Sequence, residues 1–368
     1  MTELTSHKSP IIRRIIMCLA LVCLFAGCCL LASTKQSGQG GLPVTGTQFC
    51  FDTVVSITLE DGNGLTPERA DQLLEQCFVM CRSYDEMFSR TREGSDVWRI
   101  NHSGGVPVKV SDDTLSVIRT ALEYSRLSDG MLDITIAPVK ELWDFTPEGT
   151  HSLPSEGSLK EALSHVDYHN IIVENDTVTL SDPESALDLG CIAKGYIADR
   201  LKEYLVGEGV TSAILNLGGN VLTIGSKPSG DPFVLGIRRP FADSNDSIAA
   251  IRTSDHSLVS SGVYERYFVS GGTRYHHLLN PHTGMPQDNH LLSVTILSDS
   301  STAGDALSTV CFLLGPEKGM ELIETLPDTE AVFITDDYKL HPSSGLRCVT
   351  KSDGVIPVFC VNARKNVE

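Results

Sequence analysis

The chain has few positive charges. Its 29 lysine and arginine residues stand against 47 aspartates and glutamates, so the formal net charge is −18 over 368 residues. An acidic surface of this kind repels nucleic-acid phosphates, which excludes a general nucleic-acid-binding protein. An anionic substrate would therefore need a dedicated site, supplied by a metal ion or by the free N–H groups at the start of a helix.

Cysteines and histidines at zinc-like spacing are also lacking, and no internal repeat is evident. Four of the eleven cysteines precede residue 30, and the other seven suggest no disulfide framework. Cys77 and Cys81 lie four residues apart in an expected helix, without a cysteine or histidine partner. We interpret them as buried apolar thiols.

Hydrophobic residues, by contrast, are sufficient for a sizeable core. They make up 41% of the sequence, and the length suits one large domain or two closely packed subdomains. The expected helices span residues 67–88, 112–127, 193–208, 301–314 and 316–326. A half-buried strand is expected at 48–60, with further strands between the helices, which indicates an α+β fold.

The N-terminus has the features of an export signal. Basic residues precede an apolar run at 15–32, and within that run Leu24-Phe25-Ala26-Gly27-Cys28 resembles a bacterial lipoprotein processing site. We predict a signal peptide at 1–27, a lipid-anchored Cys28, a flexible tether at 28–47 and one domain at 48–368. The protein would then lie at the cell membrane, on its extracytoplasmic face. An uncleaved membrane anchor is the alternative.

A stretch near the middle of the chain, residues 187–200, combines a strand end, a tight turn and a helix start. It carries Asp188, Gly190 and Lys194. The free N–H groups at such a helix start favour an anion such as phosphate. The simpler interpretation is an ordinary strand-to-helix connection, in which Asp188 caps the turn and Lys194 lies on the surface.

Two further stretches carry candidate ligands. Asp305 and Thr309 are four residues apart in a helix, so both oxygens fall on one face and suit a hard cation such as Mg²⁺. A capping aspartate and a back-bonding threonine would explain the same pair. The histidines at 276, 277 and 282 could form a metal cluster, but hydrogen-bonded structure or a single base agrees better with the oxygen ligands.

Taken together, four motifs resemble one family. They are Asp188-Leu189-Gly190 with Lys194-Gly195-Tyr196, Asn216-Leu217-Gly218-Gly219-Asn220, His277-Leu278-Leu279-Asn280-Pro281 with Thr283-Gly284, and Asp305-Ala306-Leu307-Ser308-Thr309. In this order they resemble the ApbE family of FAD:protein FMN transferases, from about residue 49 to the C-terminus. The resemblance implies a two-part, T-fold-related α+β body with FAD in the central cleft.

It also implies an activity: Mg²⁺-dependent transfer of FMN from FAD to a threonine or serine hydroxyl of a target protein, with release of AMP. The partner would be a flavin-accepting subunit of a membrane-bound or exported electron-transfer complex. Two alternatives remain open. Water could replace the hydroxyl, which would make the protein an FAD pyrophosphatase that releases FMN and AMP, or it could be a non-enzymatic flavin-binding lipoprotein.

Site residues follow from the same resemblance. It implies Mg²⁺ ligands from the side chains of Asp305 and Thr309 and from the backbone carbonyl of Cys191, with His277 as the candidate catalytic base or substrate orienter. The implied FAD contacts are Phe51, Thr91, Met131, Leu132, Asp133, Asp188, Lys194 and Leu278. Phe51 and Thr91 replace the residues usual in the family, so the flavin contacts are expected to differ, and Phe51 would equally suit a strand core.

Overall fold

The computed structural model describes residues 36–37, 41–146, 149, 151–242, 246–349 and 356–361. The expected signal peptide and Cys28 lie outside these residues, and both stay predictions. The expected tether is described only in part. The sheet begins inside its range, because β2 (Val44–Cys50) starts before residue 48.

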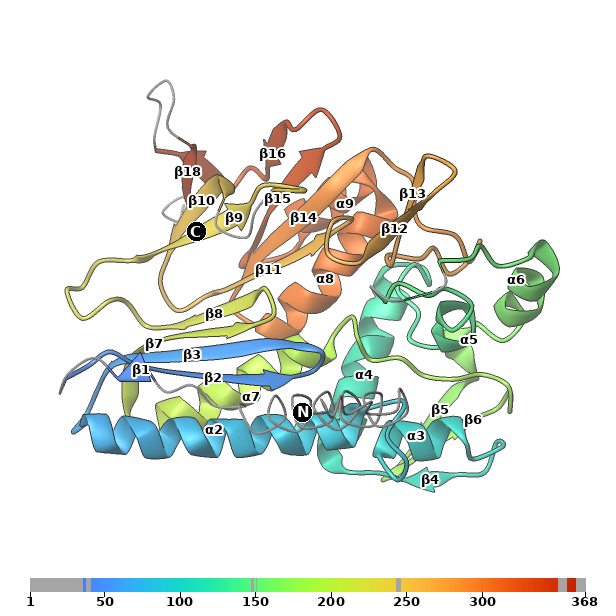
Figure 1. Ribbon diagram of the computed structural model, residues 1–368, viewed down its shortest axis with the longest axis horizontal. Coiled ribbons are helices and arrows are strands. Elements are labelled where there is room, and N and C mark those ends of the chain that lie inside the picture. The colour runs from blue at the N-terminus through green and yellow to red at the C-terminus, as the bar shows by residue number, and fades with distance from the viewer. Residues whose placement is uncertain are drawn as a thin grey trace, which may run out of the picture.

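A nine-stranded sheet runs through the whole molecule in the order β1-β2-β3-β7-β8-β11-β14-β15-β16 (Figure 1). All neighbouring strands in it are antiparallel. Besides β2, the strands are β1 (Gln36–Ser37), β3 (Thr53–Gly62), β7 (Val210–Leu217), β8 (Asn220–Ile224), β11 (Ser257–Gly262), β14 (Leu291–Ser298), β15 (Thr329–Thr335) and β16 (Leu340–Pro342).

Three smaller sheets complete the strand inventory of the described residues. The first joins β17 (Leu346–Cys348), β18 (Val358–Val361), β10 (Ser247–Thr253) and β9 (Phe233–Arg238); the second is the hairpin of β12 (Tyr267–Ser270) and β13 (Thr273–His276); the third joins β4 (Val108–Lys109), β6 (Thr177–Leu180) and β5 (Ile171–Glu174). β10 and β18 form a parallel pair, and the other pairs are antiparallel.

Five of the eight described α-helices begin after a serine or threonine that caps their first turn. Thr66 and Ser111 accept hydrogen bonds from backbone N–H groups three residues ahead, which satisfies donors that a helix start leaves free. The helices are α2 (Pro67–Phe88), α3 (Asp96–Asn101), α4 (Asp112–Leu127), α5 (Ala137–Lys140), α6 (Glu156–Leu163), α7 (Ala193–Gly207), α8 (Ser301–Leu314) and α9 (Pro316–Thr325), with a short 3₁₀ helix at Tyr168–Asn170. Among these described helices, α5, α7 and α9 have no side-chain cap.

Two large hydrophobic clusters confirm the expected two-part α+β body. One joins α2, α4 and α7 to β2, β3 and β7, and the other joins α8 and α9 to β9–β11, β14 and β15. Helix α8 contributes to both, with Ala306 and Val310 in the first and Leu307 and Cys311 in the second. Asp305 and Thr309 are on this helix, so they lie at the boundary between the two parts.

The strand expected at 48–60 is wrong as a single strand. The chain reverses at Phe51 and Asp52, both with φ of 56°, and Cys50 pairs with Thr53 across the turn. Two successive left-handed residues are typical of a two-residue hairpin turn, which usually takes asparagine or glycine. Neither is present here; Asp52 tolerates the left-handed backbone but Phe51 does not favour it, so the local signal for the turn was weak.

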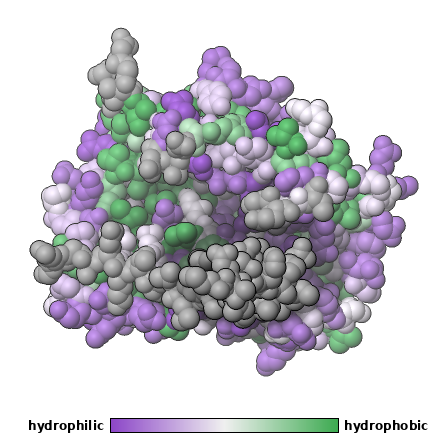
Figure 2. Space-filling model, in the orientation of Figure 1, coloured by the Kyte–Doolittle hydropathy of each residue, from purple (hydrophilic) through white to green (hydrophobic). Residues whose placement is uncertain are grey.

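Two other local expectations also differ from the structure. No regular strand precedes the turn at Asp188, and Ala186 forms only an isolated bridge with Ile136. Residues 96–101 form a helix, α3, that was not expected. The described residues contain no helix with the length and apolar character required to cross a membrane. The face drawn in Figure 2 is largely hydrophilic, in keeping with the excess of acidic residues.

Candidate active site

The site is organised around the close contact between α7 and α8. The backbone N–H of Gly195 donates a hydrogen bond to Oδ2 of Asp305, with N and O 2.9 Å apart. A β-carbon on Gly195 would lie 2.6 Å from the carbonyl carbon of Ser301 and 2.8 Å from Cβ of Asp305. Only glycine allows this approach, and it brings the Lys194 segment against the Asp305 segment.

Asp199 fixes the start of α8 from the neighbouring helix α7. Its carboxylate accepts hydrogen bonds from the N–H groups of Ser301 and Thr302, at 2.8 and 2.9 Å, and from the hydroxyls of Ser300 and Thr302. A carboxylate at a helix N-terminus satisfies free donors and interacts favourably with the helix dipole. Asp199 therefore holds α8, and Asp305 with it, in register with α7.

Asp188 is a buried carboxylate that accepts hydrogen bonds from two groups, one of them in the turn that follows it, and forms an ion pair with a third group. Its Oδ1 accepts from the N–H of Gly190 at 2.8 Å. Its Oδ2 lies 2.7 Å from Nζ of Lys140 and 3.2 Å from Nε of Arg90. Burial alone would raise the pKa of Asp188, but Lys140, the Gly190 N–H and Arg90 together hold it below 3.8. Asp188 is therefore ionised.

Lys194 lies beside Asp305, and Cys191 is close enough to both carboxylates for their charges to act on its thiol. Nζ of Lys194 is 3.9 Å from Oδ1 of Asp305 and 3.5 Å from the carbonyl oxygen of Gly190. Burial, with smaller contributions from the charges of Asp188 and Asp305, raises the pKa of the Cys191 thiol to about 12. The thiol is accordingly uncharged and a poor nucleophile or metal ligand.

Thr309 lies one turn beyond Asp305 on α8. Its Oγ1 is 3.4 Å from Oγ of Ser261, which is also 2.8 Å from Oγ of Ser308. The residues expected to hold Mg²⁺ thus offer a carboxylate, a hydroxyl and a backbone carbonyl, an all-oxygen set that suits this cation. Oδ1 of Asp305 accepts no hydrogen bond within the described part of the chain, so a carboxylate oxygen remains available.

His277 follows strand β13 and is held by the backbone at Arg266. Its own N–H and its Nδ1 lie 3.1 and 3.2 Å from the Arg266 carbonyl oxygen. Because a carbonyl can only accept, Nδ1 carries the proton and Nε2 has a free lone pair. Burial, then the positive charge of Lys140, lowers the pKa of His277 to about 3. His277 is therefore a neutral base.

Three of the implied FAD contacts, Met131, Leu132 and Asp133, have structural roles in this conformation. Both oxygens of Asp133 are occupied, one by the N–H and hydroxyl of Thr135 and the other by the N–H of Tyr168 at 2.8 Å. Burial raises the pKa of Asp133. Leu132 is fully buried and Met131 half-buried. These contacts give Asp133 a structural role in the turn that follows α4.

Leu278 is buried and also has its backbone groups engaged. Its N–H contacts Nδ1 of His276 at 3.3 Å, and its carbonyl accepts from the N–H of Gln287 at 2.9 Å. Asn280 orders the turn that follows, because its Oδ1 accepts from the N–H of His282 at 2.8 Å.

The candidates on the flavin side lie on two loops. Phe51 is half-buried at the β2–β3 turn, where it packs against the first hydrophobic cluster. Thr91 is exposed and follows Arg90, the residue that contacts Asp188. Among the described residues, no hydrogen bond or ion pair joins Phe51 or Thr91 directly to Asp188 or Asp305.

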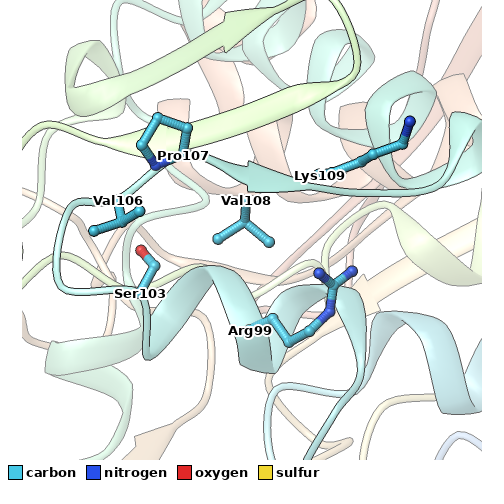
Figure 3. A pocket seen from close by; sticks show the side chains of 6 residues that line it. All are labelled: Arg99, Ser103, Val106, Pro107, Val108 and Lys109. Atoms are coloured by element: carbon cyan, nitrogen blue, oxygen red, sulfur yellow. The ribbon is translucent and has the colours of Figure 1, made fainter.

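Sequence reasoning missed two cations of the site, Lys140 and Arg90. Both reach Asp188, and Arg90 also contacts Oε1 of Glu141 at 2.9 Å. No motif marks either residue, and only the fold brings these segments to Asp188. The pocket in Figure 3 is a separate feature between α3 and β4. Its two cations, Arg99 and Lys109, already pair with Asp96 and Asp176.

The comparisons with known proteins agree with this arrangement. The family model described as "ApbE family" matches residues 51–333. A FAD:protein FMN transferase of Klebsiella pneumoniae is 37% identical over 75% of this chain and 86% of its own length. One from Vibrio cholerae is 30% identical over 91% of this chain and 98% of its own length.

Solved structures show the same fold. The ApbE protein of Thermotoga maritima superposes with a TM-score of 0.75 at 30% identity, covering 85% of this chain and 97% of its own. The flavin transferase ApbE of Vibrio cholerae gives a TM-score of 0.73 at 27% identity, covering 85% and 98%. With the family model matching most of the domain and the expected two-part body present, the chain belongs to the ApbE family.

Proposed function

We propose that this chain is a FAD:protein FMN transferase. In this reaction FMN passes from FAD to a threonine or serine hydroxyl of a target protein, and AMP is released. The relatives that carry this name support the activity, and the transfer fits the chemistry of the site. The observation that carries the proposal is the hydrogen bond from Gly195 to Oδ2 of Asp305, which joins a cationic segment to a carboxylate whose other oxygen, Oδ1, remains available at the boundary of the two cores.

Binding of the FAD diphosphate is assigned to the segment from Asp188 to Lys194 and to α8. Lys194 supplies a positive charge at the first turn of α7, where the positive end of the helix dipole also favours an anion. Asp305, Thr309 and the Cys191 carbonyl would hold Mg²⁺, which neutralises charge on the diphosphate when it is bound. This metal dependence is part of the proposal and rests on the oxygen-only donor set.

His277 is proposed as the base that activates the acceptor. Its Nε2 takes the proton of the threonine or serine hydroxyl, and the oxygen forms a new bond to the FMN phosphorus. The bond between that phosphorus and the bridging oxygen breaks, and AMP leaves with the electron pair. A neutral imidazole with one nitrogen fixed by the Arg266 carbonyl is suited to this task.

The proposed setting is the extracytoplasmic face of the cell membrane, with the chain anchored by a lipid on Cys28. This rests on the leader sequence alone. The proposed partner is a flavin-accepting subunit of a membrane-bound or exported electron-transfer complex. The lipid anchor would keep enzyme and acceptor on the same surface, where their effective concentrations are high.

A transfer assay tests the proposal. The full chain in detergent is incubated with FAD, Mg²⁺ and a flavin-carrier domain, and the carrier is separated on a denaturing gel and examined for flavin fluorescence. We expect a fluorescent carrier band that disappears when the acceptor threonine is replaced by valine. Free FMN and AMP without a labelled carrier would instead support the pyrophosphatase, and intact FAD would support a flavin-binding lipoprotein.

A further inference from the structure

Residues 134–143 connect the two loops that carry the candidate site. At one end, the N–H of Asp188 donates to the Ile134 carbonyl at 2.8 Å, and Ile136 forms a bridge with Ala186. At the other end, Nε1 of Trp143 donates to the carbonyl of Gly284, also at 2.8 Å, in the loop that follows His277. Between these two attachments lies α5, and its last residue is Lys140.

The ammonium of Lys140 lies against the Asp188–Gly190 loop, while Trp143, three residues further along the same segment, reaches the loop that follows His277. The ammonium is 2.7 Å from Oδ2 of Asp188, and a β-carbon on Gly190 would lie 3.5 Å from it. Its positive charge lowers the pKa of both the Cys191 thiol and the His277 ring. The Lys140 side chain is 29% exposed, compared with 9% for that of Asp188, so it is anchored on a buried carboxylate while its outer part remains open to solvent.

We propose that Lys140 is a positioning residue of the transfer site, which couples the Asp188 carboxylate to His277. The inference rests on the proposed function and extends it to a residue that no motif marks. One role of Lys140 is to hold the Asp188–Gly190 turn, and with it the Cys191 carbonyl, in place. The second is to keep His277 in the uncharged form that a base requires.

The second role has a defined direction. The groups whose charges act on His277 are Lys140 from α5, His276 from β13 and Arg266 from the segment before β12. Lys140 has the largest effect of the three, although burial contributes more than any of them. Removing its charge raises the pKa of His277 from about 3 towards the ordinary value of 6.5, while burial, His276 and Arg266 limit the rise. His277 is then protonated, and inactive as a base, at a higher pH.

The test compares Lys140→Met, Lys140→Arg and the control Lys318→Met, which removes the same charge from an exposed position on α9. FMN transfer by the full chain is measured against pH. For Lys140→Met we expect transfer that is roughly ten- to a hundred-fold slower, because the reacting groups are misplaced. The acidic side of the pH–rate profile of Lys140→Met should move to higher pH, whereas Lys140→Arg and Lys318→Met should keep the wild-type profile.

A binding measurement and a titration make the outcome independent of turnover. FAD affinity, followed by quenching of flavin fluorescence, should change less than the transfer rate, because Arg90 still pairs with Asp188 in Lys140→Met. Histidine C2–H resonances, with His277 identified by His277→Gln, should show the pKa of His277 rising in Lys140→Met. Coincident titrations of His277 in wild type and Lys140→Met would overturn the inference.

The two proposals fail in different ways. A wild-type chain that transfers no FMN would refute the proposed function, yet the titration of His277 would still test the coupling to Lys140. A wild-type chain that transfers FMN, together with a Lys140→Met variant of equal rate and equal pH profile, would leave the function intact and refute the role of Lys140.

Discussion

The packing of α7 against α8 gives the sharpest prediction for the site. In Gly195→Ala, the new methyl carbon would lie 2.6 Å from the Ser301 carbonyl carbon and 2.8 Å from Cβ of Asp305. Carbon atoms in contact are normally about 3.5–4.0 Å apart, so the two helices must separate by about 1 Å. This movement lengthens or breaks the hydrogen bond from the residue 195 N–H to Asp305.

The magnitude follows from three contributions. Overpacking of this kind costs about 1–3 kcal/mol. A hydrogen bond to a charged group contributes about 1.5–3 kcal/mol. Alanine recovers about 1 kcal/mol because it favours the helix more than glycine does. The free energy of unfolding should therefore fall by about 2–5 kcal/mol, and FMN transfer should fall further than stability alone explains, because Asp305 moves relative to Lys194.

Gly207→Ala is the matched control. Gly207 is the last residue of the same helix, and a β-carbon there meets nothing within 4 Å. It should leave transfer unchanged and stability equal or slightly higher. The assays are chemical denaturation followed by circular dichroism, and FMN transfer at a temperature where both variants are folded. A Gly195→Ala variant with wild-type stability and transfer would refute the contact between α7 and α8.

Three further predictions concern other parts of the chain. Asp305→Asn keeps a hydrogen-bond acceptor but loses the charge, so FMN transfer should fall by about a hundred-fold or more, the loss expected when an electrostatic partner is removed. Cys191→Ala should largely spare the transfer. Equal losses of rate in the two variants would show that the Cys191 carbonyl is misassigned. Asp199→Ala removes the carboxylate that accepts from the first N–H groups of α8, so the free energy of unfolding should fall by about 1–2 kcal/mol. An unchanged midpoint in a denaturant titration would contradict this role of Asp199. Burial raises the pKa of the Cys77 thiol to about 12, so Cys77 should resist a thiol reagent in the native protein and react only in guanidinium. The less buried Cys348 should be labelled before Cys77. Labelling is followed by mass spectrometry, and early labelling of Cys77 would contradict the described core.

Local signals account for the parts of the fold that could be predicted. The expected helices at 67–88 and 112–127 have the bounds of α2 and α4, because a proline and a capping serine mark their starts and an apolar stripe marks their length. The turn at Phe51–Asp52 was missed because Phe51 does not favour the left-handed backbone and no glycine accompanies Asp52. That conformation is held by the pairing of β2 with β3 and by the packing of the turn.

The candidate site was predictable to the extent that its residues occur in motifs. Asp188, Lys194 and Asp305 could be named from the sequence, and the structure brings them together around Gly195. Arg90 and Lys140 could not be named, because their function depends on an ion pair between distant segments and on no local spacing. Asp133 was named from the sequence, but the bonds that occupy its carboxylate, to Thr135 and to the N–H of Tyr168, depend partly on a distant segment that no local spacing marks.

The central claim is that the hydroxyl of a protein, and not water, receives FMN. The most direct measurement is the intact mass of the flavin-carrier domain after incubation with the full chain, FAD and Mg²⁺, together with the amount of AMP released. The proposed function predicts a carrier heavier by FMN less one water, with one AMP for each modified carrier. An unchanged carrier mass while AMP and free FMN accumulate together would contradict it.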